Sequence, residues 1–100
     1  MNGYDLDGVL VNGVEPEDPY VIISGRLWDE GAPDMGSALS VALRGVGSSG
    51  DVEDAGRFKA TMINLWKVDR YFEDDLTQVE IIRSMCPECE VVHVRWGFPL

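Results

Sequence analysis

The chain has 100 residues, 45% of them hydrophobic, and its 18 acidic against 8 basic residues give a formal net charge of −10. This length fits one domain, and an acidic chain is a poor ligand for long nucleic acid or an anionic membrane, because neutralising their phosphates needs clustered Lys and Arg. Neither an apolar run near the roughly 20 residues of a membrane span nor a signal-peptide start is present, so we expect one cytoplasmic domain.

Short apolar runs alternate with helical patterns along the chain, which is typical of a mostly parallel sheet flanked by helices. The second and fifth runs are nearly continuous, as expected for strands that are covered on both faces. The predicted strands are residues 1–5, 19–23, 40–44, 69–72 and 90–95. The first is unusually short and gives the centre of the sheet little length to bury.

A first helix is predicted over residues 54–67, with Asp51 or Asp54 as its cap. Apolar residues recur in it at helical spacing and predict one buried face. These residues are Phe58, Met62, Leu65 and Trp66. The segment from Arg26 to Leu39 is predicted to hold only a short helix near 27–30, because Gly and Pro interrupt it.

A second helix is predicted over residues 76–85, where Thr77 and Glu80 have the spacing of a capping box. Cys86 and Cys89 follow in the sequence CPEC. With His93 they offer three zinc ligands, one fewer than a closed structural site needs. We therefore interpret CPEC as the turn that ends this helix.

Polar residues follow the predicted strands at the edge where open α/β sheets bind ligands. After the first strand come Asp5 and Asp7, two carboxylates that point the same way if the strand geometry persists, and then Gly8, which permits a sharp turn. One carboxylate can attack phosphorus while the other delivers a proton to the leaving oxygen.

After the second strand, Ser24 and Gly25 offer a hydroxyl and exposed backbone N–H groups to a phosphoryl oxygen. Near the start of the first helix, Lys59 offers a flexible positive charge. Lys67 is the rival lysine, but it lies near the helix end, where a cation suits the helix dipole and needs no function.

After the fourth strand come three consecutive acids, Glu73, Asp74 and Asp75. Hard carboxylate oxygens suit Mg²⁺, which takes one or two direct carboxylates together with waters and substrate phosphate. Calcium binding of the EF-hand type is excluded for Asp5-x-Asp7-Gly8, because Val9 and Pro16 stand where that loop needs ligands.

The motifs DLDGVL, ISGR, FKA and FEDDLTQV occur in this order between Asp5 and His93, and they resemble the four motifs of the haloacid dehalogenase (HAD) superfamily. The resemblance implies a three-layer, Rossmann-like α/β fold with a mostly parallel five-stranded sheet. It also implies a Mg²⁺-dependent phosphatase that acts through an aspartyl-phosphate. The chain departs from the family in having Val9 where most members have threonine.

The resemblance also assigns roles to residues that bind the substrate or react with it. Asp5 would be the nucleophile and a Mg²⁺ ligand, and Asp7 would be the general acid and then the base, with its carbonyl on the metal. Ser24 would bind the transferring phosphoryl group together with Gly25. Arg26, which follows this serine, would bind a second phosphate or another anion.

The remaining roles fall to the lysine and to the three acids. Lys59 would stabilise Asp5 and the phosphate. Asp74 would complete the metal site, with Asp75 beside it and Glu73 in a supporting place. A catalytically silent HAD-like binding or assembly module is the alternative, since one sequence cannot show that these residues are used.

The spacing of the motifs leaves no room for a cap domain, because Asp7 and Ser24 are 17 residues apart and Ser24 and Lys59 are 35 apart. Water must then be excluded by the substrate or by a second copy in a homo-oligomer. Trp28, Arg44 and the 45–53 loop are candidates to line the entrance. We expect a small phosphorylated substrate such as a nucleotide.

Overall fold

The structure, a computed structural model, describes residues 1–27, 36–44 and 51–95. Its five strands form one sheet in the order β3-β2-β1-β4-β5, and each neighbouring pair is parallel. The strands are β1 (Asn2–Tyr4), β2 (Tyr20–Leu27), β3 (Val41–Arg44), β4 (Arg70–Glu73) and β5 (Glu90–His93). The predicted α/β class and all five strands are therefore confirmed.

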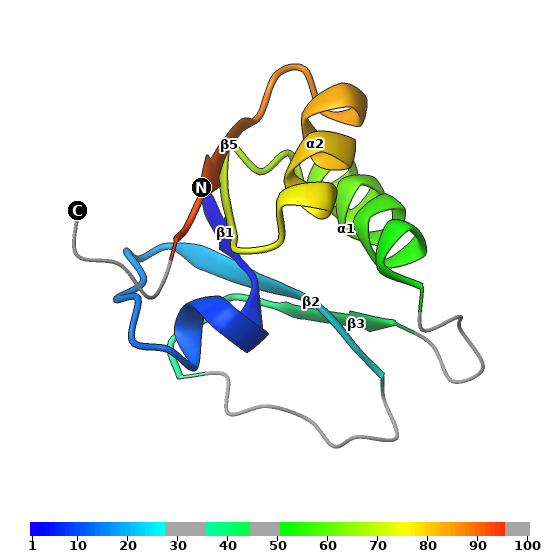
Figure 1. The fold of residues 1–100 in the computed structure, drawn as a ribbon. Helices are drawn as coiled ribbons and strands as arrows, with labels where there is room; N and C mark the ends of the chain where they lie inside the picture. Colours follow the sequence, from blue (N-terminus) through cyan, green and yellow to red (C-terminus); the bar gives the residue numbers. More distant parts are fainter. Residues whose placement is uncertain (28–35, 45–50, 96–100) are drawn as a thin grey trace.

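Both regular helices of the described chain, α1 (Val52–Trp66) and α2 (Leu76–Met85), pack against the same face of the sheet (Figure 1). The opposite face is covered by the short irregular turn η1 (Leu6–Leu10) and by half-buried residues of the connections. This division follows from right-handed crossovers, since the chain moves across the sheet in one direction from β1 to β3 and in the other from β3 to β5.

One face of the sheet therefore carries the two helices, and in the described residues the other is covered by η1 and connecting chain, so the three-layer, Rossmann-like arrangement stays a prediction. The predicted short helix near 27–30 is contradicted at Leu27, which belongs to β2, and its other residues lie outside the described chain. No cap domain occurs in the part of the chain that is described. Nor does any helix there have the length and apolar content to cross a membrane.

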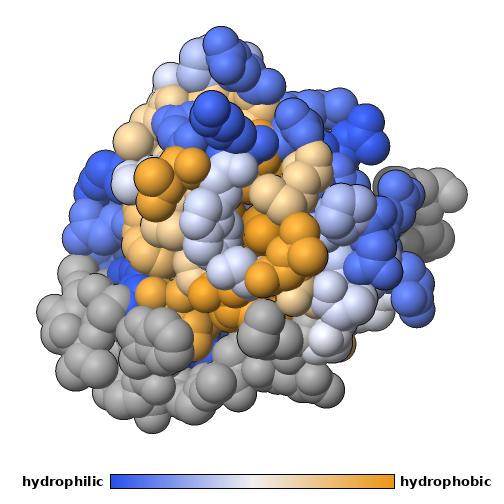
Figure 2. All heavy atoms as spheres, turned by 180° about the vertical axis from the view of Figure 1, so that it is seen from behind, coloured by the Kyte–Doolittle hydropathy of each residue, from blue (hydrophilic) through white to orange (hydrophobic). Residues whose placement is uncertain are grey.

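The buried face of α1 differs from the predicted one. Leu65 is 67% exposed, and Phe58, Met62 and Trp66 are only partly buried. The buried residues are instead Ala55, Gly56, Lys59, Ala60 and Ile63. Small side chains on this face let α1 approach the sheet and α2 closely. Leu65 of the predicted face therefore stays accessible. On the side of the molecule seen from behind, apolar residues gather near the centre and hydrophilic ones border them (Figure 2).

The three-residue strand β1 is held at the centre of the sheet by a tyrosine that crosses over it. A Cβ at Gly3 would lie 3.0 Å from the Tyr71 ring, a tight contact, so glycine lets the ring lie close over β1 without displacement. The Tyr71 hydroxyl donates a buried hydrogen bond of 2.6 Å to the Ile23 carbonyl of β2. The ring from β4 thus spans β1 and joins three strands beneath the helices.

Both helices begin at aspartate caps. Asp51 accepts a hydrogen bond from the Glu53 N–H, which decides between the two predicted caps of α1. For α2 the prediction of Thr77 was wrong, because the cap is Asp75, whose carboxylate accepts from the N–H of Gln78. The helix itself ends at Met85, as predicted.

The CPEC segment is the end of α2, as interpreted from the sequence. Cys86 is the buried residue that follows the helix, and both cysteines are free thiols. Cys89 precedes β5, whereas His93 ends that strand and lies with its Nε2 3.1 Å from the carbonyl oxygen of Asp74. His93 is therefore separated from the two cysteines by the length of β5.

Candidate functional site

The predicted acids meet at the centre of the sheet, where β1 and β4 lie side by side. The connection after β1 runs toward β2 and the connection after β4 runs toward β5, in opposite directions. Such a switch point opens a crevice at the carboxyl ends of the strands, which is where open α/β sheets bind ligands. Asp5 directly follows β1, and Glu73 ends β4.

Strand alternation turns these two acids toward α1. Tyr4 and Phe72 point to the other face, where their rings stack with centroids 4.7 Å apart. Asp5 and Glu73 are the next residues along and therefore point to the α1 face, which carries Lys59. The buried face of α1 thus includes a charged residue because it faces two buried carboxylates.

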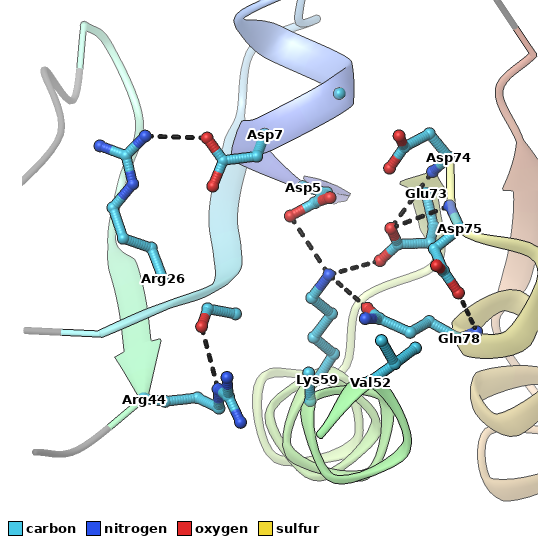
Figure 3. A pocket seen from close by; sticks show the side chains of 13 residues that line it. Asp5, Asp7, Arg26, Arg44, Val52, Lys59, Glu73, Asp74, Asp75 and Gln78 are labelled. Atoms are coloured by element: carbon cyan, nitrogen blue, oxygen red, sulfur yellow. Dashed lines mark hydrogen bonds and ion pairs between the residues drawn. The ribbon is translucent and has the colours of Figure 1, made fainter. Parts of the chain in front are cut away.

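Lys59 is the hub of the site (Figure 3). It is only 3% exposed, and its Nζ lies 3.2 Å from Asp5 Oδ1 and 2.6 Å from Glu73 Oε1. It also donates a hydrogen bond of 2.6 Å to Oε1 of Gln78. The structure therefore brings the predicted lysine and the predicted nucleophile together. Lys67, the rival, is the exposed C-cap of α1.

The charges of this cluster are out of balance, because two buried carboxylates share one ammonium. Burial raises the pKa of Asp5 and outweighs the opposing effect of Lys59. Burial likewise raises the pKa of Glu73 to about 8, with the charge of Asp5 adding to the shift. Burial alone would lower the pKa of Lys59, but Asp5 and Glu73 together raise it. The ammonium is thus retained while the acids favour a proton or a cation.

Three of these acids form a group that fits a metal ion. Asp5, Glu73 and Asp74 each offer a carboxylate oxygen, and the three oxygens lie within 4.8 Å of one another. Such an all-oxygen set suits Mg²⁺ better than softer metals. Space for the Asp74 carboxylate exists only because Gly8 has no side chain, since a Cβ there would lie 2.1 Å from Asp74 Oδ2.

Among the three consecutive acids, Glu73 and Asp74, and not Asp75, lie in the group that could hold a metal ion, whereas Asp74 with Asp75 was expected. Glu73, for which only a supporting place was expected, belongs to this group, and it accepts from the N–H groups of Asp74 and Asp75. The Asp75 carboxylate caps α2. A role for Asp75 at a metal stays a prediction. Period-two alternation after the buried Tyr71 is the signal that points Glu73 inward.

Asp7 and Arg26 lie at the mouth of the site. The Asp7 side chain is 59% exposed, and its Oδ1 is 2.8 Å from Nη2 of Arg26. Gly8 follows with φ of 81°, a left-handed conformation that favours glycine, and begins the turn over the site. The predicted acid-base residue is therefore at the entrance, while Asp5 lies at the base.

Ser24 lies within a strand, whereas it was expected directly after one. It belongs to β2, which was expected to end at residue 23, and it is fully buried. Its Oγ accepts a hydrogen bond of 3.1 Å from the Arg26 N–H. By alternation Ser24 shares the η1 face with Ile22, whereas Gly25 faces Ala55 and Lys59.

These residues surround a pocket of about 350 Å³. Five acids and three bases line it, an excess of two acids by formal count, and burial favours the protonated forms of Asp5 and Glu73. The lining residues are Asp5, Asp7, Gly8, Gly25, Arg26, Arg44, Val52, Ala55, Lys59, Glu73, Asp74, Asp75 and Gln78. Arg44 is therefore part of the pocket as expected, and its Nε donates to the Gly25 carbonyl at 2.9 Å. Trp28 and residues 45–50 lie outside the described chain.

Comparison with known proteins gave no match to a family model, to a curated protein or to a solved structure. Inference about function therefore depends on the arrangement of the side chains themselves.

The raised pKa of Glu73 predicts how stability depends on pH in metal-free protein. Below pH 4.5, the ordinary pKa of a glutamate, this carboxyl is protonated in the folded and in the unfolded protein. Between pH 4.5 and about 8 the unfolded chain has released the proton, but the folded protein still holds it. The free energy of unfolding should therefore fall as pH rises through this window. Urea denaturation in EDTA at pH 5.5 and 8.5 measures it, and Glu73→Gln should flatten the decline. An equal decline in both proteins would contradict the assignment to Glu73.

Proposed function

We propose that this chain is a cytoplasmic, HAD-type, Mg²⁺-dependent phosphomonoester hydrolase with Asp5 as its nucleophile. The observation that carries the proposal is the buried contact of Asp5 with Lys59, in which Asp5 also forms a group of three carboxylates with Glu73 and Asp74 at the switch point of a parallel sheet. A structural ion pair needs no second and third acid beside it. A site for a cation and a phosphate does.

Two donors lie on the same oxygen of Asp5. The Leu6 N–H is 2.9 Å and the Lys59 Nζ 3.2 Å from Oδ1, so Oδ2 is the oxygen that attacks phosphorus. The bond from phosphorus to the leaving oxygen breaks, and Asp7 gives that oxygen a proton. A water then attacks the same phosphorus and passes a proton to Asp7. The bond between phosphorus and Asp5 breaks, which releases phosphate.

The residues that would hold Mg²⁺ are Asp5, Glu73 and Asp74. When bound, the ion supplies positive charge that offsets the charge growing on the transferring phosphoryl oxygens. The excess of acids in the pocket makes this charge necessary, because a phosphate dianion would otherwise enter a site that repels it. Lys59 lines the same pocket, lies 3.2 Å from Asp5 Oδ1 and keeps that carboxylate in place.

The proposed substrate is a small phosphoester such as a nucleotide. A pocket of about 350 Å³ is at the lower end of the range for small-molecule sites. The net charge of −10 disfavours binding of a long polyanion. A homo-oligomer that covers the site stays a prediction, which the mass of the species in solution would test.

One observation favours the alternative of a silent HAD-like module. The Ser24 hydroxyl is fully buried and bonded within its own strand, where the proposed chemistry would use it on a phosphate. In a silent module the acids and Lys59 would serve only to bind a cation or a partner.

Assay of the wild-type chain separates the two candidates. We expect hydrolysis of p-nitrophenyl phosphate, and faster hydrolysis of one or more members of a nucleotide panel, in the presence of Mg²⁺. Addition of EDTA should lower the rate by roughly 100-fold or more, and excess Mg²⁺ should restore it. Binding of Mg²⁺ by calorimetry without turnover on any substrate would support the silent module.

A further inference from the structure

Gln78 is a buried polar residue of the site that the sequence analysis did not select. It lies in the first turn of α2, is 8% exposed, and places Oε1 2.6 Å from the Nζ of Lys59. Buried polar side chains need hydrogen-bond partners, and the partner of Gln78 is a lysine that already contacts two carboxylates. Packing alone does not explain why a third acceptor lies beside this lysine.

The number of donors on Lys59 gives that reason. An ammonium has three N–H donors and no acceptor. Three acceptors surround Nζ in the described chain, namely Asp5 Oδ1, Glu73 Oε1 and Gln78 Oε1. With all three directions occupied, the otherwise flexible lysine is fixed in position and in rotation. An acid at position 78 would add charge to the excess already present, whereas the amide supplies an acceptor without charge.

The close packing of α1 and α2 places Gln78 within hydrogen-bond distance of Lys59. Gly56 lies one turn before Lys59 on α1, and a Cβ there would lie 3.4 Å from both Cα and Cγ of Gln78. A Cβ at Gly56 would thus already be in contact with Gln78, which shows how closely α1 and α2 pack at this level. The Asp75 cap holds the Gln78 N–H at 2.9 Å and fixes the backbone from which its side chain extends.

We propose that Gln78 is a positioning residue, which acts through Lys59 by holding its ammonium against Asp5. The inference rests on the proposed phosphatase function for its kinetic consequence. Its structural consequence, a lysine ammonium held in place by Gln78, is independent of that function. The two parts are therefore tested by different measurements.

The kinetic test uses Gln78→Met, which keeps a long unbranched side chain but removes the acceptor. We expect kcat for p-nitrophenyl phosphate with saturating Mg²⁺ to fall by roughly 10- to 100-fold, because a misplaced lysine no longer supports Asp5 in the transition state. KM should stay within about twofold, since Gln78 is expected to act on Lys59 and not on the substrate itself. Thr77→Met, at the exposed neighbouring position, is the matched control and should keep the wild-type kcat. A wild-type kcat in Gln78→Met would overturn the proposal.

The structural test follows the Lys59 ammonium by ¹H–¹⁵N NMR of protein labelled with ¹⁵N-lysine. A buried ammonium with three partners exchanges its protons slowly with water, and we expect at least about tenfold faster exchange in Gln78→Met. Gln78→Glu retains an acceptor and should keep exchange slow. Should the methionine variant fail to fold, Gln78→Asn, which withdraws the acceptor by one methylene, carries the same expectation.

These outcomes separate the two proposals. Unchanged exchange in a folded Gln78→Met or Gln78→Asn protein overturns the positioning role, whatever the activity. Faster exchange in a chain whose wild type shows no Mg²⁺-dependent turnover keeps the positioning role and removes the phosphatase.

Discussion

Replacement of Asp5 by asparagine is expected to lower Mg²⁺-dependent turnover of a phosphomonoester by roughly three orders of magnitude, about 4 kcal/mol in transition-state stabilisation. The amide has nearly the same shape as the carboxylate but cannot attack phosphorus. It also offers a cation a weaker ligand. The loss should appear in kcat, measured with p-nitrophenyl phosphate and with the best nucleotide of the panel.

The same variant should remain folded, which distinguishes loss of chemistry from loss of structure. Burial raises the pKa of Asp5, so the charged form is disfavoured where it stands. A neutral isostere removes its repulsion from Glu73 and leaves the pair of Glu73 with Lys59 intact. We therefore expect a free energy of unfolding at neutral pH equal to or above that of the wild type, measured by urea denaturation in EDTA.

Asp69→Asn is the matched control for this substitution. Asp69 is an exposed aspartate at the opposite end of the strands, where it pairs with the chain's amino terminus. Its replacement should leave turnover unchanged. Full activity in Asp5→Asn would show that the nucleophile is another residue. A phosphate adduct on Asp5, found by mass spectrometry after acid quench of the wild type, would support the assignment directly.

The sequence predicted the elements that hold the site better than the direction of their side chains. All five strands and both long helices occur near their predicted positions, because apolar periodicity and turn residues are local signals. The predicted end of the second strand at residue 23 was wrong, and the reason lies outside that segment. β2 continues to Leu27 because it pairs with Arg44 of β3 after a shift in register, and no pattern within residues 19–27 reveals that partner.

The inward position of Lys59 was implied by the family resemblance, while the apolar pattern pointed to a different face of the same helix. Counting large apolar residues favoured Phe58, Met62 and Leu65. The structure buries Ala55, Ala60 and Ile63 around the lysine instead. Close approach of the helix to the sheet requires small side chains. A lysine can be buried there only because it forms ion pairs with Asp5, which follows β1, and with Glu73, which ends β4. That compensation is non-local, so the helix sequence alone cannot predict it.

Gly8→Ala is expected to separate the metal site from the stability of the fold. Gly8 has φ of 81°, so a side chain there is strained, and its Cβ would lie 2.1 Å from Asp74 Oδ2. The carboxylate is the far end of a side chain and can move away at small cost. The movement takes it out of the group it forms with Asp5 and Glu73. Mg²⁺ affinity, measured by calorimetry, should fall by roughly 10- to 100-fold.

Gly13→Ala is the control that isolates the cost of the backbone. Gly13 also has positive φ, 100°, but nothing lies within 4 Å of the position that an alanine methyl group would take, so only the strained conformation is penalised. Both variants should lose about 1–2 kcal/mol of unfolding free energy in EDTA. Only Gly8→Ala should lose Mg²⁺ affinity and, with it, turnover. Equal Mg²⁺ affinity in the two folded variants would mean that the Asp74 carboxylate is not a ligand, and that the cation is held by Asp5 and Glu73 without it.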